Sequence, residues 1–283
     1  MKRAVLSLLL VLFACISAHA QQSQPQPLTF WYDYTINAGK EDQFMDLVKT
    51  VGAPVRDKLM ADGVILAWGM ETPLLRARGQ GTHLIWFAVN DWSGIEKVDA
   101  AMRAQLAKLA ADDAKSAEGK KGKPGPTIAE RSREAIDGSK TVDYLTRDLV
   151  AGFSNTPPPA GALPFTRYNF TKVKPGKAAD YRKAWEKYNK PVLDKLIADG
   201  TIAAYGLAVE EVKTTGDFTH FTWYAAKDLA GFEKVRSAFI ADRDHRTEEE
   251  RNAINDLFTG LTDPDAARAE VTRSLMFHVS APK

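Results

Sequence analysis

The chain has 283 residues, of which 45% are apolar, 26% charged and 10% aromatic, the composition of an ordinary globular protein. This balance excludes a disordered chain, a collagen-like fibre and a disulfide-rich scaffold. The length allows either one large domain or two of about 120 residues each.

The first twenty residues have the pattern of an export signal. Lys2 and Arg3 precede an apolar run over residues 4–14, and residues 18–20 (Ala-His-Ala) form the small-x-small pattern that signal peptidases cleave. The run is too short to span a bilayer as a mature helix. We therefore expect a periplasmic or secreted protein with no membrane span, cleaved after Ala20. A second interpretation makes Cys15 a lipidated N-terminus, but bulky Phe13 suits that motif poorly.

Cleavage would remove the chain's only cysteine and leave 36 basic and 36 acidic residues. Proteins that bind nucleic acid usually carry a basic face, so we expect no nucleic-acid partner. The one basic cluster, over residues 120–123, has no aromatic neighbours and is expected to be a solvated loop.

The most informative feature is an internal repeat. When the chain is offset by 137 residues, 23 of the 60 positions from Gly39 to Val98 are identical to their counterparts without a gap. A second match has an offset of 126 and aligns Thr146-Arg147 with Thr272-Arg273, so the first copy carries about 11 extra residues. The Gly- and Pro-containing stretch over residues 120–126 is expected to hold them. The boundaries expected are 29–150 for the first copy, 151–164 for a Pro/Gly-rich linker and 165–280 for the second.

Each copy follows the same order of predicted elements. Residues 30–36 and 166–173 are rich in aromatic and β-branched residues, which favours strands. Helical periodicity follows, with Pro54 and Pro191 predicting a kink in each helix. Strands are predicted over 64–71 and 82–89, and over 201–212 and 218–225. Ser93 and Glu96 form a capping-box pattern for the next helix, where Asp228 is the expected cap in the second copy. Closing strands are predicted over 142–149 and 269–277.

Each copy therefore has the order β-α-β-β-α-β, which is the ferredoxin-like plan. The fold class expected is α+β: two ferredoxin-like repeats packed sheet to sheet as an α/β barrel, because one sheet face of each copy still needs cover. This duplicated order, with Asp-Gly after the first helix and aromatic-rich strands, resembles the dimeric α/β-barrel superfamily. The resemblance implies a barrel with helices outside. The superfamily includes cofactor-free oxygenases, haem-binding and haem-degrading enzymes, isomerases and dehydratases.

His83 and His220 occupy equivalent positions at the start of a predicted strand. One hypothesis makes them barrel-lining catalytic residues that act as acid or base, or as a haem ligand. The alternative is that each histidine joins strand and loop through hydrogen bonds.

Arg147 and Arg273 are also equivalent, and strand alternation places both among apolar residues. An unpaired buried charge is costly. Each arginine could therefore anchor a ligand carboxylate inside the barrel, or pair with a carboxylate of the scaffold.

Aromatic residues on the strands are the remaining candidates for ligand binding. Trp68 and Tyr205 are equivalent and each precedes a glycine, Gly69 or Gly206, which can mark a close backbone approach. Trp86 and Trp223 form a second equivalent pair. Large rings of this kind would suit a flat or apolar ligand.

No motif in the sequence indicates a metal, phosphate-loop, dinucleotide or Gly-x-Ser-x-Gly site. The leading hypothesis is a protein that binds a small, partly apolar ligand between its sheets. The alternatives are an oxygenase or haem-linked enzyme that uses a barrel histidine, and an assembly protein with no small ligand. The identity of any cofactor and the oligomeric state stay open.

Overall fold

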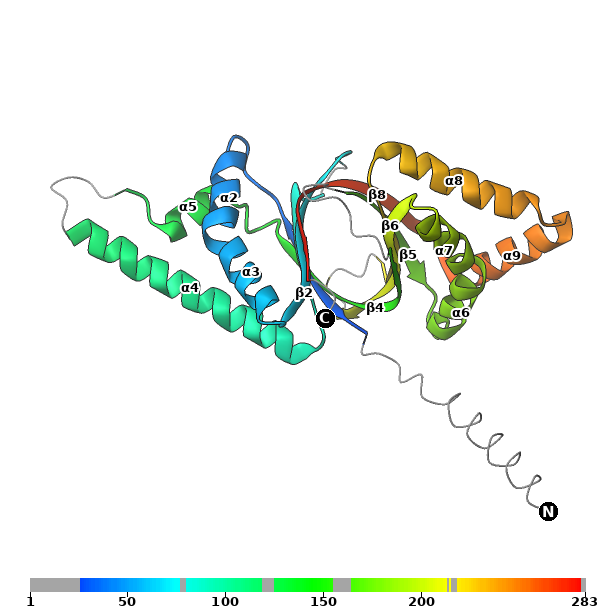
Figure 1. Ribbon diagram of the computed structural model, residues 1–283, viewed down its shortest axis with the longest axis horizontal. Helices are drawn as coiled ribbons and strands as arrows, with labels where there is room; N and C mark the ends of the chain where they lie inside the picture. Colours follow the sequence, from blue (N-terminus) through cyan, green and yellow to red (C-terminus); the bar gives the residue numbers. More distant parts are fainter. Residues whose placement is uncertain are drawn as a thin grey trace, which may run out of the picture.

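The structure is a computed structural model that describes residues 26–76, 80–118, 125–154, 164–212, 214 and 218–280. In this part of the chain, eight strands form a closed antiparallel barrel, and helices cover it in two groups on opposite sides (Figure 1). The expected export signal, Cys15, the basic cluster at 120–123 and most of the expected linker lie outside the described residues.

Two successive runs of elements build the barrel. The first comprises β1 (Leu28–Tyr34), α2 (Glu41–Leu47), the π-helix η1 (Val48–Gly52), α3 (Ala53–Ala61), β2 (Ile65–Pro73), β3 (His83–Val89), α4 (Trp92–Glu118), α5 (Ile128–Ala135) and β4 (Val142–Phe153). The second comprises β5 (Phe165–Val173), α6 (Ala178–Tyr188), α7 (Lys190–Ala198), β6 (Ile202–Val212), β7 (His220–Ala226), α8 (Leu229–Asp244), α9 (Glu248–Leu261) and β8 (Thr262–Val279). The strand β4 therefore continues to Phe153, into the segment expected to be a linker.

The strands close in the order β1-β3-β2-β8-β5-β7-β6-β4. Each run contributes four neighbouring strands, and the two sets meet edge to edge where β2 pairs with β8 and β4 pairs with β6. The expectation that two sheets pack face to face is corrected on this point. The backbone groups at the sheet edges bond across the two junctions, so the sheets form one continuous wall.

The predicted helix kinks lie where the prolines require them. Pro54 follows η1 at the start of α3, and Pro191 follows the break at Asn189 at the start of α7. Proline has no N–H to donate and its ring collides with the preceding turn, so each helix is interrupted there. The two interruptions differ, because the first is a π-helical turn and the second is a break of one residue.

Two details at the next helix pair differ from expectation. Asp91 caps α4 by accepting a hydrogen bond from the Gly94 backbone N–H, whereas Ser93 donates its hydroxyl to Asp91. Asp228 caps α8 in the same way, as predicted. The extra length of the first copy is visible in α4, which has 27 residues against 16 in α8, and not only in the segment at 120–126.

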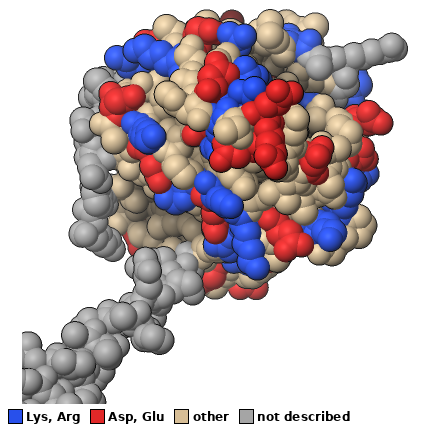
Figure 2. Space-filling model, turned by 90° about the vertical axis from the view of Figure 1, so that its right-hand side faces the viewer, with Lys and Arg blue, Asp and Glu red and all other residues tan. Residues whose placement is uncertain are grey.

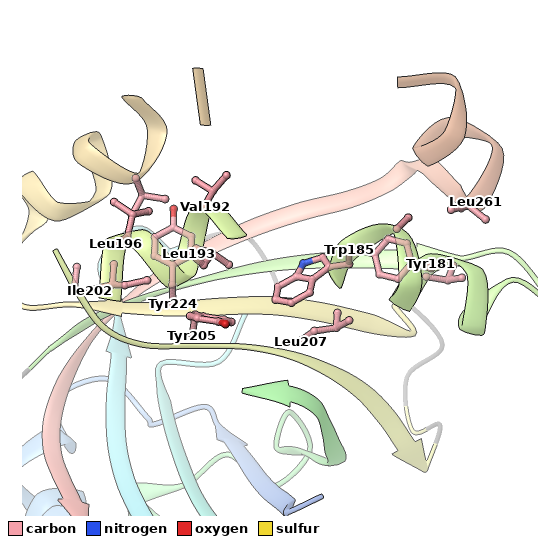
Figure 3. Close-up of a cluster of buried hydrophobic side chains, with 14 residues drawn as sticks. Tyr181, Trp185, Val192, Leu193, Leu196, Ile202, Tyr205, Leu207, Tyr224 and Leu261 are labelled. Carbon is pink, nitrogen blue, oxygen red and sulfur yellow. The ribbon is translucent and has the colours of Figure 1, made fainter. Parts of the chain in front are cut away.

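Apolar side chains fill the space between the helices and the outer face of the barrel. In the second run, Trp185 from α6, Leu193 from α7 and Tyr205 from β6 belong to one such cluster, and all are at most 3% exposed (Figure 3). Two further clusters lie under α2–α4, around Phe44 and Trp68. The helix-facing side of the barrel is therefore a conventional core.

A separate aromatic cluster fills the barrel interior. Cross-strand partners share a face of the sheet, and Trp31 pairs with Trp86 while Tyr168 pairs with Trp223. The interior cluster is made of Tyr168, Ala208, Phe218 and Phe221, with Trp31, Tyr144, Phe170 and Trp223 packed against it. The interior is thus a second core and not an empty channel.

The surface over the second helix group carries basic and acidic side chains interspersed with one another (Figure 2). None of the helices in the described residues has both the length and the apolar character that a membrane crossing requires.

Candidate functional site

Buried polar and charged side chains lie in the barrel interior, at one of its openings and beneath the helices. In the interior, the ring of Trp31 lies edge-on to Tyr168 at 5.8 Å and to Phe221 at 6.0 Å between ring centroids. Edge-to-face contacts of this kind are the favoured geometry for aromatic packing. They hold the rings in fixed positions, so any polar group among them must find its partner locally.

Glu71 of β2 is the hub of the polar contacts in the interior, and it is 2% exposed. Its carboxylate accepts hydrogen bonds from Trp86 Nε1 at 3.0 Å, from the Tyr168 hydroxyl at 3.0 Å and from the Thr272 hydroxyl. Burial raises the pKa of Glu71, while the three donors oppose that rise. Because these contacts join β2, β3, β5 and β8, Glu71 ties together strands from both runs.

Trp223 has a partner of the same kind on a different strand. Its indole N–H bonds to the carboxyl of Asp148 on β4, and burial raises the pKa of Asp148 to about 7. Glu71 is the cross-strand partner of Ser274, and Asp148 is the cross-strand partner of Ala208. The sequence offsets align Glu71 with Ala208 and Asp148 with Ser274. The strand pair β2–β8 corresponds to the pair β6–β4. Trp86 therefore bonds to a carboxylate on β2, whereas Trp223 bonds to a carboxylate on β4, which corresponds to β8 and not to β2.

One end of the barrel opens into a small cavity, which we call the mouth. Its free space is about 40 Å³, and its lining is mostly aromatic: Trp31, Asp33, Leu84, Tyr144, Thr146, Tyr168, Phe170, Phe218, Phe221, Arg268 and Glu270. A water needs roughly 10–15 Å³ measured in this way. The mouth therefore has room for a few waters, and the barrel behind it is filled by side chains.

Three charged side chains lie among the rings of the mouth. Burial raises the pKa of Asp33 to about 6; the neighbouring Glu270 carboxylate adds to the rise, whereas a hydrogen bond from the Gly81 backbone opposes it. Burial also raises the pKa of Glu270. Arg268 stacks over the Phe170 ring at 4.4 Å and lies 3.5 Å from Glu270. The mouth thus combines an aromatic wall with two carboxyl groups whose pKa values are raised by burial.

The two predicted catalytic histidines do not line the barrel. His83 and His220 are 6% and 3% exposed, and they face the helices, packed against Phe44 of α2 and Tyr181 of α6. Alternation along β3 and β7 directs Trp86 and Trp223 inward and the histidines outward. Each histidine Nδ1 lies 3.0 Å from the hydroxyl of the preceding threonine. Thr82 and Thr219 in turn accept from backbone N–H groups of the loop or strand opposite.

These histidines do not fit the role of a haem ligand. Burial lowers the pKa of His220 to about 4, and its Nε2 has no hydrogen-bond partner among the described residues. Its ring nevertheless lies 5.4 Å from the Tyr181 ring, and neither His83 nor His220 lines the mouth or the groove between helices described below. A haem would have to displace α2 or α6 to reach either ring. Among the described residues there is also no cluster of three or more His, Cys, Asp and Glu side chains that could hold a metal.

The two arginines predicted to bind ligand also lie outside the barrel interior. Arg147 forms a two-pronged ion pair with Glu211 of the neighbouring strand, at 2.7 and 2.9 Å. This partner is the scaffold carboxylate that the alternative interpretation required. Arg273 is exposed. Neither lines the mouth, because the inward positions of these strands belong to Thr146 and Thr272.

The four predicted aromatic ligand-binding residues divide between the two faces. Trp68 and Tyr205 face the helices, where they donate to Asp57 of α3 and Asp194 of α7. Trp86 and Trp223 face inward but do not line the mouth.

Gly69 and Gly206 each lie directly against the ring of an inward tryptophan. A Cβ on Gly69 would lie 2.8 Å from the Trp86 ring, and one on Gly206 would lie 2.4 Å from the Trp223 ring. The absence of a side chain at each glycine leaves room for an inward tryptophan.

Sequence reasoning missed Glu71, Asp148, Asp33, Arg268 and Glu270. One available signal was the spacing of Glu71, two residues after Gly69 and therefore on the same strand face. The pairing of Asp33 with Glu270 has no local signal, because it depends on closure of the barrel.

Comparison with known proteins identifies the fold. No family of related sequences matches the chain, and no curated protein matches it. Among solved structures, the chain is similar to a protein of Fusobacterium nucleatum subsp. nucleatum ATCC 25586 provisionally named a monooxygenase. The TM-score is 0.55 at 13% identity, over 91% of this chain and 96% of that one. A protein of Lactobacillus acidophilus NCFM with the same provisional name gives 0.52 at 10% identity, over 90% and 97%.

An anthrone oxidase-like protein gives a TM-score of 0.50 at 11% identity, over 92% of this chain and 96% of that one. At these identities the likeness concerns the fold alone, a closed antiparallel barrel that is compatible with a dimeric α/β-barrel fold.

The paired indole–carboxylate contacts generate a double-mutant test. Asp148→Ser should lower the free energy of unfolding by about 1–3 kcal/mol, because it leaves the Trp223 N–H without its acceptor. Adding Ala208→Glu should recover part of that loss, because the pair then has the Glu–Ser arrangement found at Glu71 and Ser274. Chemical denaturation of both single variants and the double variant measures the coupling. If the free energy of unfolding of the double variant is no higher than the two single effects predict by addition, the two sites are not equivalent.

The burial of His220 generates a pH test. Its folded pKa of about 4 lies below the ordinary value of 6.5. The unfolded chain therefore binds a proton that the folded chain refuses. Stability should fall as pH decreases from 6.5 towards 4, by up to about 1.4 kcal/mol per pH unit from this residue.

Asp33 and Asp148 have raised folded pKa values. They therefore contribute the opposite slope, with stability lost as pH rises towards 6 or 7. The His220 contribution is isolated by subtracting the unfolding curve of His220→Asn from that of the parent. His245→Asn, at the exposed end of α8, is the control. Parallel curves for the parent and His220→Asn would refute the assignment.

Proposed function

We propose that this chain binds a small, single-ring aromatic or partly apolar molecule at the mouth of its barrel. The free space of about 40 Å³ is smaller than a ring requires, so lining side chains must move to admit it. The observation that carries the proposal is the composition of the mouth, where six aromatic residues surround a solvent-accessible space that contains a cation and two carboxyl groups. Ligand sites typically combine apolar walls with a few placed polar groups. The side chains that fill the barrel behind the mouth argue for a ligand at the mouth and against the position first expected, between the sheets.

The polar groups indicate which ring substituents would bind. Asp33 and Glu270 can accept hydrogen bonds when ionised and donate when protonated. Burial raises the pKa of both groups, and that of Asp33 to about 6. Arg268 already lies over the Phe170 ring, a geometry that a second aromatic ring could extend. A phenol or other ring that carries a hydroxyl group satisfies both features.

We further propose that the chain arose by duplication of a ferredoxin-like unit, and that it is exported. The first proposal is supported by the sequence repeat and by the identical pairing of strands within each run, β1-β3-β2 and β5-β7-β6. The second is supported by the pattern of residues 1–20.

Binding at the mouth is tested by titration calorimetry with phenol. The variant Leu84→Trp replaces an aliphatic side chain in the lining of the mouth with a larger aromatic one. Because this side chain occupies the space of the ligand, it should weaken phenol binding about tenfold or more. The control is Leu106→Trp, which adds the same side chain at a 43% exposed position on α4. The proposal fails if the parent protein does not bind phenol, or if both variants bind it as the parent does.

An oxygenase is the second candidate, and one observation favours it. Asp33 lies among the aromatic residues of the mouth with a pKa of about 6, which suits a general base that removes a proton from a phenolic substrate. The histidines are too far inside the helix-facing core to serve. Asp33→Asn should abolish oxygen uptake with single-ring phenols in an oxygen-electrode assay while phenol binding persists. Uptake at the parent rate in Asp33→Asn would eliminate Asp33 as the base.

A further inference from the structure

A second cavity lies outside the barrel, between helices α6, α8 and α9. We call it the arginine groove, after Arg243, Arg246 and Arg251 in its lining, and its free space is about 140 Å³. It shares no residue with the mouth. An enclosed apolar cavity of about 150 Å³ accommodates benzene, so the arginine groove has room for a single-ring molecule.

The lining of the arginine groove is divided between charge and apolar surface. The rings of Tyr188, Phe239 and Phe258 supply apolar surface. Three guanidinium groups are present against a single carboxylate, that of Asp242. A site with this balance favours a ligand that has an apolar body and a negative charge.

Existing contacts hold the arginines in place without neutralising them all. Arg246 pairs with Asp242 at 2.5 Å and lies over the Tyr188 ring at 5.4 Å. Arg251 donates from Nη1 to the backbone carbonyl of Arg246 at 3.1 Å. Arg243 contacts Asp244 at 3.3 Å, in a pair whose side chains are more than half exposed and therefore weakly bound.

The corresponding part of the first run is apolar. The offset of 137 aligns Arg243 with Leu106 and Arg246 with Leu109, and it aligns Tyr188 with Val51. In the first run, Leu109 packs on the cluster that contains Val51. The second run therefore has arginines around an open cavity, where the first run has the packed Leu109 and the exposed Leu106. Packing beneath the helix does not require an arginine at the position of Arg246, because Leu109 supplies that packing in the first run.

We propose that the arginine groove binds a small organic anion of the aromatic carboxylate class, with its ring on the apolar surface and its carboxylate at the arginines. This site is separate from the mouth and does not depend on the function proposed there.

Titration calorimetry of the purified full chain tests the proposal with three probes. Benzoate carries both features, inorganic phosphate carries only the charge, and benzyl alcohol carries only the ring. We expect benzoate to bind more tightly than either of the others. Equal affinity for phosphate would overturn the role of the apolar surface, and equal affinity for benzyl alcohol would overturn the role of the arginines.

Arginine-to-leucine variants locate the site. Arg243→Leu and Arg246→Leu each introduce the residue found at the corresponding position of the first run, and each should weaken benzoate binding about tenfold. The matched control is Arg236→Leu, on the same helix but paired with Glu233 and 68% exposed. Thermal unfolding verifies that each variant is folded. If Arg246→Leu unfolds because it loses the contact with Asp242, the benzoate affinity of Arg243→Leu is the test of the proposal. Unchanged benzoate affinity in Arg243→Leu, or an equal loss in Arg236→Leu, overturns the proposal.

Discussion

Closure of the barrel is the constraint on which the rest of the structure depends. Because β2 pairs with β8 and β4 pairs with β6, the two groups of strands form one wall, and the side chains inside it are separated from those beneath the helices. A polar group inside this wall must be satisfied by another inward side chain or by trapped water. The three donors on Glu71 and the contact of Trp223 with Asp148 are the result.

The two runs meet this constraint with different residues. Both keep an inward tryptophan and the glycine beneath it, because any side chain at Gly69 or Gly206 would collide with the indole. The acceptor for the indole has changed strand, from β2 in one case to β4 in the other. Exchange between cross-strand partners is possible because their side chains approach the same point in the interior. The indole N–H requires a nearby acceptor, but it does not require that acceptor to come from one particular strand.

The sequence allowed the order of elements to be predicted, because it depends on local periodicity, prolines and glycines. The inward face of the strands could not be predicted in the same way. On β3, Ile85 and Phe87 point one way, and Leu84 and Trp86 the other, so both faces are apolar and hydrophobicity does not distinguish them. For this reason the sequence left both interpretations of the histidines open, and the structure places their rings outside the barrel, against the helices. The mouth could not be predicted at all, because Asp33 and Glu270 come from opposite runs and meet only through closure of the barrel.

Charge in the helix layers also differs between the runs. Arg56 of α3 is 3% exposed, lies over Trp68 at 5.7 Å and corresponds to Leu193 in the second run. Gly52, at the end of the π-helix η1, leaves room for it, since a Cβ there would lie 2.5 Å from Arg56 Nη1. The arginine groove shows the reverse exchange, with arginine in the second run and leucine in the first.

A helix layer tolerates such exchanges more readily than a closed interior does. One of its sides is solvent, so a long side chain can keep its charged end hydrated or share it with a ligand. The interior has no such outlet, and a new charge there needs a complete set of partners at once. Differences in binding between the two runs should therefore be sought first among the helices and at the mouth of the barrel, where a single substitution can be accommodated.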